Sequence, residues 1–140
     1  MKFIFESKKN NNVSKLVAEY RLSFSDDHEG WLYIFKIYEE NNIDNDSFDF
    51  MLKIMDNGTD LKVVALYPDQ KNYYLGRGIS VSIILKAKDI FGKRIISSSC
   101  LKPTYLGESI SDLAVKKVWN RLVDIGKAKY CCSLEHFYLL

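Results

Sequence analysis

Residues 61–99 contain the feature that most restricts how this chain folds: an apolar strand, a turn with two glycines, an amphipathic helix and a second apolar strand. Leu61–Tyr67 is nearly all apolar, as expected of a central strand that is covered on both faces. A helix is predicted over Ile79–Phe91, where apolar residues recur every four positions, and Gly92 ends it. Lys93–Ser98 predicts the second strand. Such a short strand, helix and strand sequence predicts a parallel pair joined by a right-handed crossover.

The turn ahead of the helix predicts a phosphate-binding site. Gly76 and Gly78 flank Arg77 there, and closely spaced glycines between a strand and a helix leave backbone N–H groups free at the helix start. The helix dipole adds partial positive charge at the same place, and several N–H donors together suit a diphosphate. We therefore predict the site at residues 76–80. Arg77 is a candidate for an additional charge-assisted contact, and the alternative is an exposed loop arginine.

The residues before this stretch predict antiparallel strands joined by tight turns. Apolar and polar residues alternate along them, which is the period of a half-buried strand. Asn57-Gly58 between two such runs is a strong hairpin signal, and 8–12 and 25–30 are further predicted turns. A helix remains an alternative around 13–20 and over 47–55, because apolar residues there also fit helical spacing. The predicted strands are residues 1–7, 16–24, 31–39, 48–54 and 61–67.

The C-terminal part predicts a second helix and one or two last strands. Ser109 and Asp112 resemble a capping box, and Gly126 ends the helix. The predicted buried stripe of this helix is Val115, Val118, Trp119 and Leu122. Cys100–Glu108 is a predicted loop, and Tyr130–Leu139 supplies the last strands.

Together these elements predict one domain over residues 1–140, of the α/β class in its mixed α+β form. Its central sheet is mostly antiparallel, with one parallel βαβ unit and two main helices. The strand before the crossover has an antiparallel neighbour on one side and a parallel neighbour on the other. Pairing with the parallel neighbour can therefore fail at one end, which would leave a cleft beside the phosphate site.

Composition excludes several classes of protein. The chain has 140 residues, 47% of them hydrophobic and 14% aromatic, which is enough for a core and rules out a disordered chain. Apolar runs fall short of the roughly 18 residues that a membrane span needs, and Met1–Phe5 is too short for a secretory signal. We therefore expect a cytoplasmic protein that is not inserted in a membrane.

The cysteines and histidines predict neither disulfides nor a metal site. There are three cysteines, an odd number that makes a poor disulfide framework. Cys131 and Cys132 are adjacent, so in a strand one would be buried and the other exposed, both as free thiols. His28 and His136 are far apart in the sequence, and the chain has no CxxC or HxxxH spacing, so a metal site is not expected.

Charge is divided unevenly between the two halves of the chain. Residues 71–140 carry twelve Lys and Arg against five Asp and Glu, a net +7, and residues 1–70 carry eight against thirteen, a net −5, which sum to +2. The half that contains the phosphate site is thus electropositive, as suits an anionic ligand. The alternative for any single lysine is a solvated surface position. Nucleic-acid binding would need a denser basic patch.

The run Leu75-Gly76-Arg77-Gly78-Ile79-Ser80 resembles the pyrophosphate loop of GNAT-type N-acetyltransferases, which lies between a strand and the following helix. Gly78 matches the first glycine of that motif. Leu75 stands where the family usually has Gln or Arg, and Ser80 stands where it has Gly or Ala. The resemblance extends over about residues 61–139, and the order of elements agrees with the family.

This resemblance implies an acetyl-CoA-dependent N-acetyltransferase in which an amine attacks the thioester directly. It implies that the backbone N–H groups of residues 76–80 bind the pyrophosphate and that the pantetheine lies along Leu66. The implied cofactor-binding residues are Leu66, Tyr67, Leu75, Gly76, Arg77, Gly78, Ile79 and Ser80. The acceptor would be an amine, such as one on a protein, and the expected state is a monomer or homodimer.

Two departures from the family bear on catalysis. The family often has a tyrosine on its last helix to protonate the leaving thiolate, whereas this chain has Trp119 in that neighbourhood, a residue that we expect in the core. The family also places two helices between its first two strands, whereas here 25–30 is only a turn, which suits a large acceptor. Strand 61–67 offers no carboxylate as general base. Asp69, Tyr105 and Glu108 are candidates by loop position, so the catalytic residues stay unassigned.

Two competing interpretations belong to other classes. One is a catalytically degenerate GNAT-like protein that acts as a binding or interaction module, which the missing phenol and missing helices motivate. The other is a winged-helix nucleic-acid binder, because residues 118–130 and 137–139 resemble a recognition helix and wing. That fold needs two more helices just upstream, which the sequence does not supply.

Overall fold

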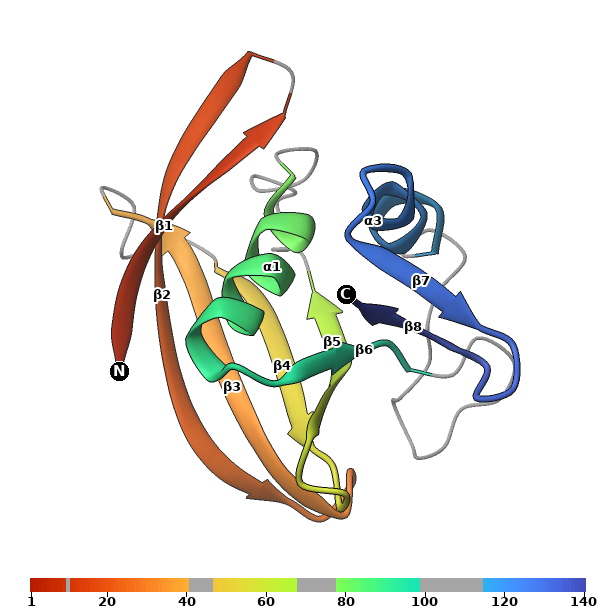
Figure 1. The fold of residues 1–140 in the computed structure, drawn as a ribbon. Helices are drawn as coiled ribbons and strands as arrows, with labels where there is room; N and C mark the ends of the chain where they lie inside the picture. The colour runs from red at the N-terminus through yellow and green to blue at the C-terminus, as the bar shows by residue number, and fades with distance from the viewer. Residues whose placement is uncertain (10, 41–46, 68–77, 99–114) are drawn as a thin grey trace.

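The computed structural model describes residues 1–9, 11–40, 47–67, 78–98 and 115–140, and it leaves out the side chains of 65–67 and 115–116. The described residues form an α+β fold with one mixed sheet of eight strands (Figure 1). The strands are β1 (Lys2–Lys9), β2 (Asn12–Ser25), β3 (Gly30–Glu39), β4 (Phe48–Ile54), β5 (Asp60–Tyr67), β6 (Arg94–Ile96), β7 (Ala128–Cys131) and β8 (His136–Leu139). The helical segments are α1 (Ile79–Phe91), the π-helical turn η1 (Val115–Trp119) and α3 (Asn120–Asp124).

The first five strands form a continuous antiparallel series in sequence order. The two helical alternatives, around 13–20 and over 47–55, are therefore wrong. In β4 the reason is visible in the burial pattern, because Phe48, Phe50 and Leu52 are all buried on one side of the strand. The polar turn predicted over 8–12 is shorter than expected, because β1 extends to Lys9 and β2 begins at Asn12.

The predicted parallel pair is confirmed, although β6 covers only Arg94–Ile96 of the predicted strand Lys93–Ser98. β5 pairs with β6 in parallel, and α1 connects them with the bounds expected from the sequence. Gly92 follows the helix at φ 62°, and its N–H donates to the carbonyl oxygen of Lys88. This left-handed residue ends the helix because glycine adopts a positive φ without a steric penalty.

The second helical region begins as a π-helical turn and continues as the short helix α3, so it is not one regular α-helix within the described residues. Gly126 follows it at φ 76°, as predicted. The final hairpin, β7 and β8, starts at Ala128, earlier than the predicted Tyr130. β8 lies between β6 and β7 in the sheet. Ser109, Asp112 and the predicted loop Cys100–Glu108 lie outside the described residues.

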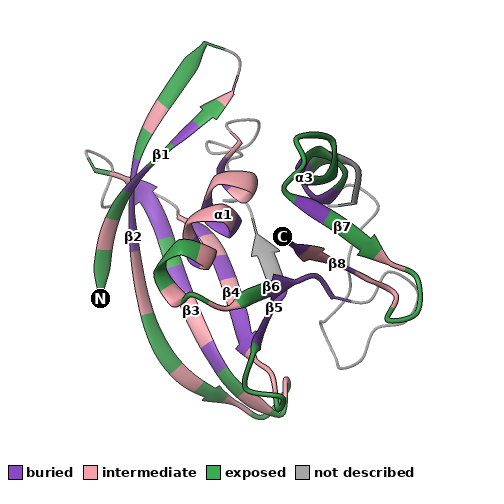
Figure 2. Cartoon of the chain, in the orientation of Figure 1, coloured by how far each residue is buried: buried purple, intermediate pink, exposed green. Residues whose placement is uncertain are grey.

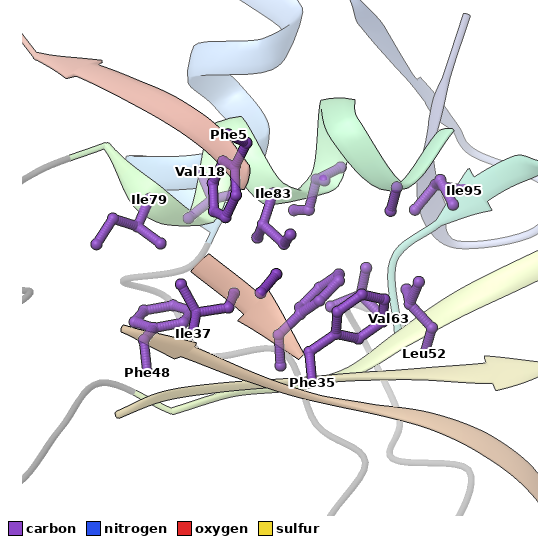
Figure 3. Close-up of a cluster of buried hydrophobic side chains, with 14 of the residues drawn as sticks. Phe5, Phe35, Ile37, Phe48, Leu52, Val63, Ile79, Ile83, Ile95 and Val118 are labelled. Carbon is purple, nitrogen blue, oxygen red and sulfur yellow. The ribbon is translucent and has the colours of Figure 1, made fainter. Parts of the chain in front are cut away.

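The core lies between α1 and the face of the sheet that this helix covers (Figures 2 and 3). Ile79, Ile83, Ile84 and Ala87 of α1 are buried against apolar side chains of β1 to β5. At the end of the helix Phe91 stacks on Tyr33 with ring centroids 4.4 Å apart. These contacts hold α1 along the sheet, and with it the start of the helix, where the phosphate site is predicted.

The cysteine expectation is met in part. Cys132 is exposed, whereas Cys131 is half-buried instead of fully buried, and both are free thiols. Among the helices that the structure describes, none has both the length and the apolar composition for a membrane span.

Candidate functional site

The ladder between β5 and β6 stops halfway along β5. Paired positions cover only Asp60 to Lys62 of β5, whereas β5 itself runs on to Tyr67. At the next position the side chain of Ser98 replaces a backbone partner, because its Oγ donates to the carbonyl oxygen of Val63 at 2.7 Å. Within the described residues, parallel pairing therefore ends before the carboxyl-terminal half of β5, in agreement with the predicted failure at one end.

The chain after β6 leaves β5 because it pairs with β8 instead. The N–H of Ser97 donates to the carbonyl oxygen of Phe137 at 2.9 Å, and the Oγ of Ser97 accepts the N–H of the same residue at 2.9 Å. The side chains of Ser97 and Ser98 are both buried. β5 and β6 separate at these two serines. Their hydroxyl groups bond the carbonyl oxygen of Val63 and the N–H of Phe137, so these buried backbone groups keep a hydrogen-bond partner.

The start of α1 has backbone donors without a helical acceptor. Gly78 precedes the helix at φ 72°, and the N–H of Ser82 donates to its carbonyl oxygen at 3.1 Å as the first bond of the helix. The N–H groups of Ile79, Ser80 and Val81 come before that bond and have no helical acceptor. In this first turn, which the structure describes completely, there is neither an acidic residue nor a side-chain cap.

The chain between the end of β5 and the start of α1, residues 68–77, lies outside the described residues. In a parallel strand, helix and strand unit, ligands bind at the carboxyl ends of the strands, near the helix start. Leu66 and Tyr67 lie in the last part of β5, opposite Phe50 and Asp49 of β4. The predicted residues Leu66 and Tyr67 therefore belong to the end of β5, whereas Gly78, Ile79 and Ser80 belong to the start of α1.

The predicted site residues have different surroundings. Ile79 is 2% exposed and belongs to the core, so only its backbone is available to a ligand. Ser80 is half-buried. Leu75, Gly76 and Arg77, and the general-base candidates Asp69, Tyr105 and Glu108, lie outside the described residues.

The structure adds β1 to this region, which the sequence did not predict. A Cβ built on Gly78 would lie 2.8 Å from the carbonyl oxygen of Lys8 and 3.7 Å from the Cβ of Lys9. The end of β1 thus contacts the start of α1, and Figure 1 shows the arrowhead of β1 near that end of the helix. One sequence feature could have indicated this contact. Phe3, Phe5, Ser7 and Lys9 alternate along β1, so all four residues lie on one face of the strand.

Ser7 is a polar residue on this inner face of β1. It is 0% exposed, and its Oγ makes no hydrogen bond in the structure. Phe5, two residues earlier on the same face, belongs to the core cluster together with Ile79 and Ile83 of α1. Along β1, Ser7 therefore stands between Phe5, which packs in the core, and Lys9, which lies next to Gly78. This places Ser7 beside the first turns of α1.

Trp119 lies in the core, as expected. It is 1% exposed, and its ring stacks on Phe137 with centroids 5.8 Å apart. A buried indole in this position has no access to a leaving thiolate. Its neighbour Asn120 is exposed but has no proton that it readily donates as an acid.

Comparison of this chain with models of protein families, with curated proteins and with solved structures finds no match. Within the part of the chain that the structure describes, no three His, Cys, Asp or Glu side chains gather closely enough to hold a metal ion.

Proposed function

We propose that this chain is an acetyl-CoA-dependent N-acetyltransferase of the GNAT type. The observation that supports this proposal most directly is the geometry of β5, α1 and β6. Among the described residues, parallel pairing with β6 covers three positions of β5, and the first N–H groups of the crossover helix α1 have no helical acceptor and no acidic residue in the same turn. A diphosphate fits such an electropositive helix start, and an extended thioester arm fits the part of β5 beyond its described pairing with β6.

The residues of the chain would contribute mainly by binding and orientation. The N–H groups of Ile79 and Ser80 would donate hydrogen bonds to the pyrophosphate, and the backbone of Leu66 would hold the pantetheine. The amine nitrogen then attacks the thioester carbonyl and forms the C–N bond of the amide, the C–S bond breaks, and the thiolate takes up the proton that the nitrogen loses. Holding both reactants in line, with N–H groups aimed at the carbonyl oxygen, lowers the barrier without a side chain that reacts.

The acceptor side would be open. β2 and β3 are connected by a turn of four residues, Asp26–Glu29, between strands that pair from Ser25 and Gly30 onward. Such a tight turn leaves no room for helices that would wall off a small acceptor pocket. We therefore propose a large amine acceptor, such as a protein, and a cytoplasmic location fits this proposal.

Calorimetric titration with acetyl-CoA tests the proposal. Ser80→Glu adds a carboxylate at the start of α1, where it stabilises the helix but repels phosphate groups. We expect the wild-type chain to bind acetyl-CoA, Ser80→Glu to bind it at least tenfold more weakly, and the control Ser133→Glu in the exposed β7–β8 turn to bind as wild type does. Failure of acetyl-CoA to produce heat or to raise the melting temperature would contradict the proposal.

The second candidate function is a GNAT-like binding module without catalysis, which the burial of Trp119 favours. The two functions differ in one measurement. An acetyltransferase releases free CoA thiol when a panel of amines is added, whereas a binding module holds acetyl-CoA without turnover.

A further inference from the structure

We propose that Ser7 and Lys9 of β1 complete the phosphate site at the start of α1, and that they bind a phosphate group of a nucleotide-containing cofactor. The cofactor is CoA if the function proposed above is correct, so this inference depends on that function for the identity of the ligand. The existence of the anion site does not depend on the proposed function.

The first observation is the unpartnered hydroxyl of Ser7. The residue is 0% exposed, and its Oγ has no hydrogen-bond partner. Buried polar groups nearly always have a hydrogen-bond partner, so an unpartnered hydroxyl is available to donate to a water, an ion or a ligand. The hydroxyl belongs to the face of β1 that packs on α1, because Phe5 on the same face is part of the core with Ile79 and Ile83.

The second observation is that β1 ends against the helix start. The contact between Gly78 and the carbonyl oxygen of Lys8 places the Cβ of Lys9 next to the residue that precedes the helix. Lys9 is half-buried, and none of the described carboxylates forms an ion pair with it. A lysine ammonium on a flexible stem of four carbons is a common partner for phosphate.

The third observation is the charge at the helix start itself. The first turn of α1 contains no acidic residue, and no side chain caps it. The partial positive charge of the dipole, the free N–H groups and the cation of Lys9 therefore act in the same direction. An anion would satisfy all of them, together with the hydroxyl of Ser7.

The test uses Ser7→Ala and Lys9→Gln, with acetyl-CoA and inorganic pyrophosphate as separate calorimetric probes. Ser7→Ala should weaken binding of both probes about tenfold, the loss expected for one hydrogen bond to a charged group. Lys9→Gln should weaken binding about fivefold and reduce its dependence on salt. Lys8→Gln is the matched control, since it removes the same charge from the opposite face of the same strand, and we expect binding close to wild type.

Stability of the unliganded protein distinguishes a ligand-binding hydroxyl from a structural one. Removal of a buried hydroxyl that has no partner should leave the melting temperature unchanged or raise it, whereas loss of a structural hydrogen bond would lower it. We expect Ser7→Ala to keep the melting temperature of the free protein and to lose most of the shift that the ligand produces.

The outcomes separate this inference from the proposed function. If wild type binds pyrophosphate through Ser7 and Lys9 but does not bind acetyl-CoA, the site stands and the acetyltransferase proposal fails. If acetyl-CoA binds equally to wild type and to both variants, the function stands and the role of β1 is overturned. If neither probe binds wild type, both are overturned.

Discussion

Arg94 at the start of β6 holds the carboxylate of Asp60 at the start of β5 through two hydrogen bonds, Nε to Oδ1 at 2.9 Å and Nη2 to Oδ2 at 2.8 Å. The two residues are directly opposite in the parallel pair. Asp60 is almost fully buried, and its Oδ2 also accepts the side-chain N–H of Asn57 at 3.0 Å. This ion pair fixes the register of β5 and β6 at the end opposite to the proposed phosphate site.

We expect Asp60→Asn to lower the free energy of unfolding by about 2–3 kcal/mol at neutral pH. Removing one partner of a buried ion pair costs roughly 3–5 kcal/mol, and the value here is smaller because water reaches the Arg94 side chain. That side chain is 45% exposed. Urea denaturation of wild type and variant at pH 7 measures the difference. An unchanged midpoint would mean that the pair does not hold the strands together.

The same pair predicts a loss of stability in acid. Hydrogen bonds from Arg94 hold the pKa of Asp60 below its ordinary value of 3.8, against the opposing effect of burial. The Asp60 carboxylate therefore binds a proton more readily in the unfolded chain than in the folded chain. The contribution of the ion pair to the free energy of unfolding is complete above about pH 4 and decreases as the pH falls through the pKa of Asp60 in the folded protein. The stability difference between wild type and Asp60→Asn should shrink below that pH. A difference that stays constant down to pH 2 would contradict the assignment.

Tyr38 predicts a transition in alkali. Its hydroxyl donates to the Oε1 of Glu19 at 2.5 Å, and this bond, with burial, raises the pKa of Tyr38 to about 12. Because the pKa of Tyr38 is raised, the protonated phenol stabilises the folded protein below the ordinary value of 10. This stabilisation is lost as the pH rises towards about 12. Absorbance at alkaline pH, compared between wild type and Tyr38→Phe, should show one phenol that titrates late. Glu19→Gln should return this pKa towards 10, and a phenol that titrates normally in wild type would exclude the bond.

Gly78 and Gly58 provide a matched pair of substitutions. Both have a positive φ, 72° and 74°, but a Cβ on Gly78 would lie 2.8 Å from the carbonyl oxygen of Lys8, whereas a Cβ on Gly58 would meet nothing within 4 Å. Gly58→Ala should cost only the backbone strain, about 1 kcal/mol. Gly78→Ala should cost about 1–3 kcal/mol more, since β1 must also move. Equal losses on urea denaturation would show that β1 does not contact the helix start in solution.

Trp119 should behave as a core residue. It stacks on Phe137, so Trp119→Ala should lower the free energy of unfolding by roughly 3–5 kcal/mol, whereas Val123→Ala on the same helical segment should cost less than about 1 kcal/mol. Trp119→Phe keeps an aromatic ring in the core and should keep acetyl transfer as well. Loss of transfer in Trp119→Phe with unchanged stability would instead place this indole at the reaction.

Local sequence patterns predicted most of the elements and one part of the candidate site. The bounds of α1 follow from its i+4 apolar spacing and from Gly78 and Gly92, which take positive φ at its two ends. The alternation along β2 and β4 is longer than the helical spacing that competes with it, because a sheet with one face on the core buries every second residue. The end of parallel pairing near β5 followed from the order of the strands.

Local sequence patterns do not predict contacts between residues that are far apart in the sequence. Asp60 and Arg94 are 34 positions apart, and nothing in either neighbourhood indicates the other. The insertion of β8 between β6 and β7 and the π-helical turn at Val115–Trp119 likewise depend on how the C-terminal part packs.

The sequence by itself determined which stretches form β1 to β5, the bounds of α1 and the lack of helical acceptors for the first N–H groups of α1, since these follow from side-chain period, from glycine conformation and from helix geometry. Only the tertiary structure decided that the end of β1 lies against that helix start, with Ser7 buried and without a partner beside it. Periodicity specifies which face of a strand is apolar, but the element that covers this face is selected by the packing of the whole core.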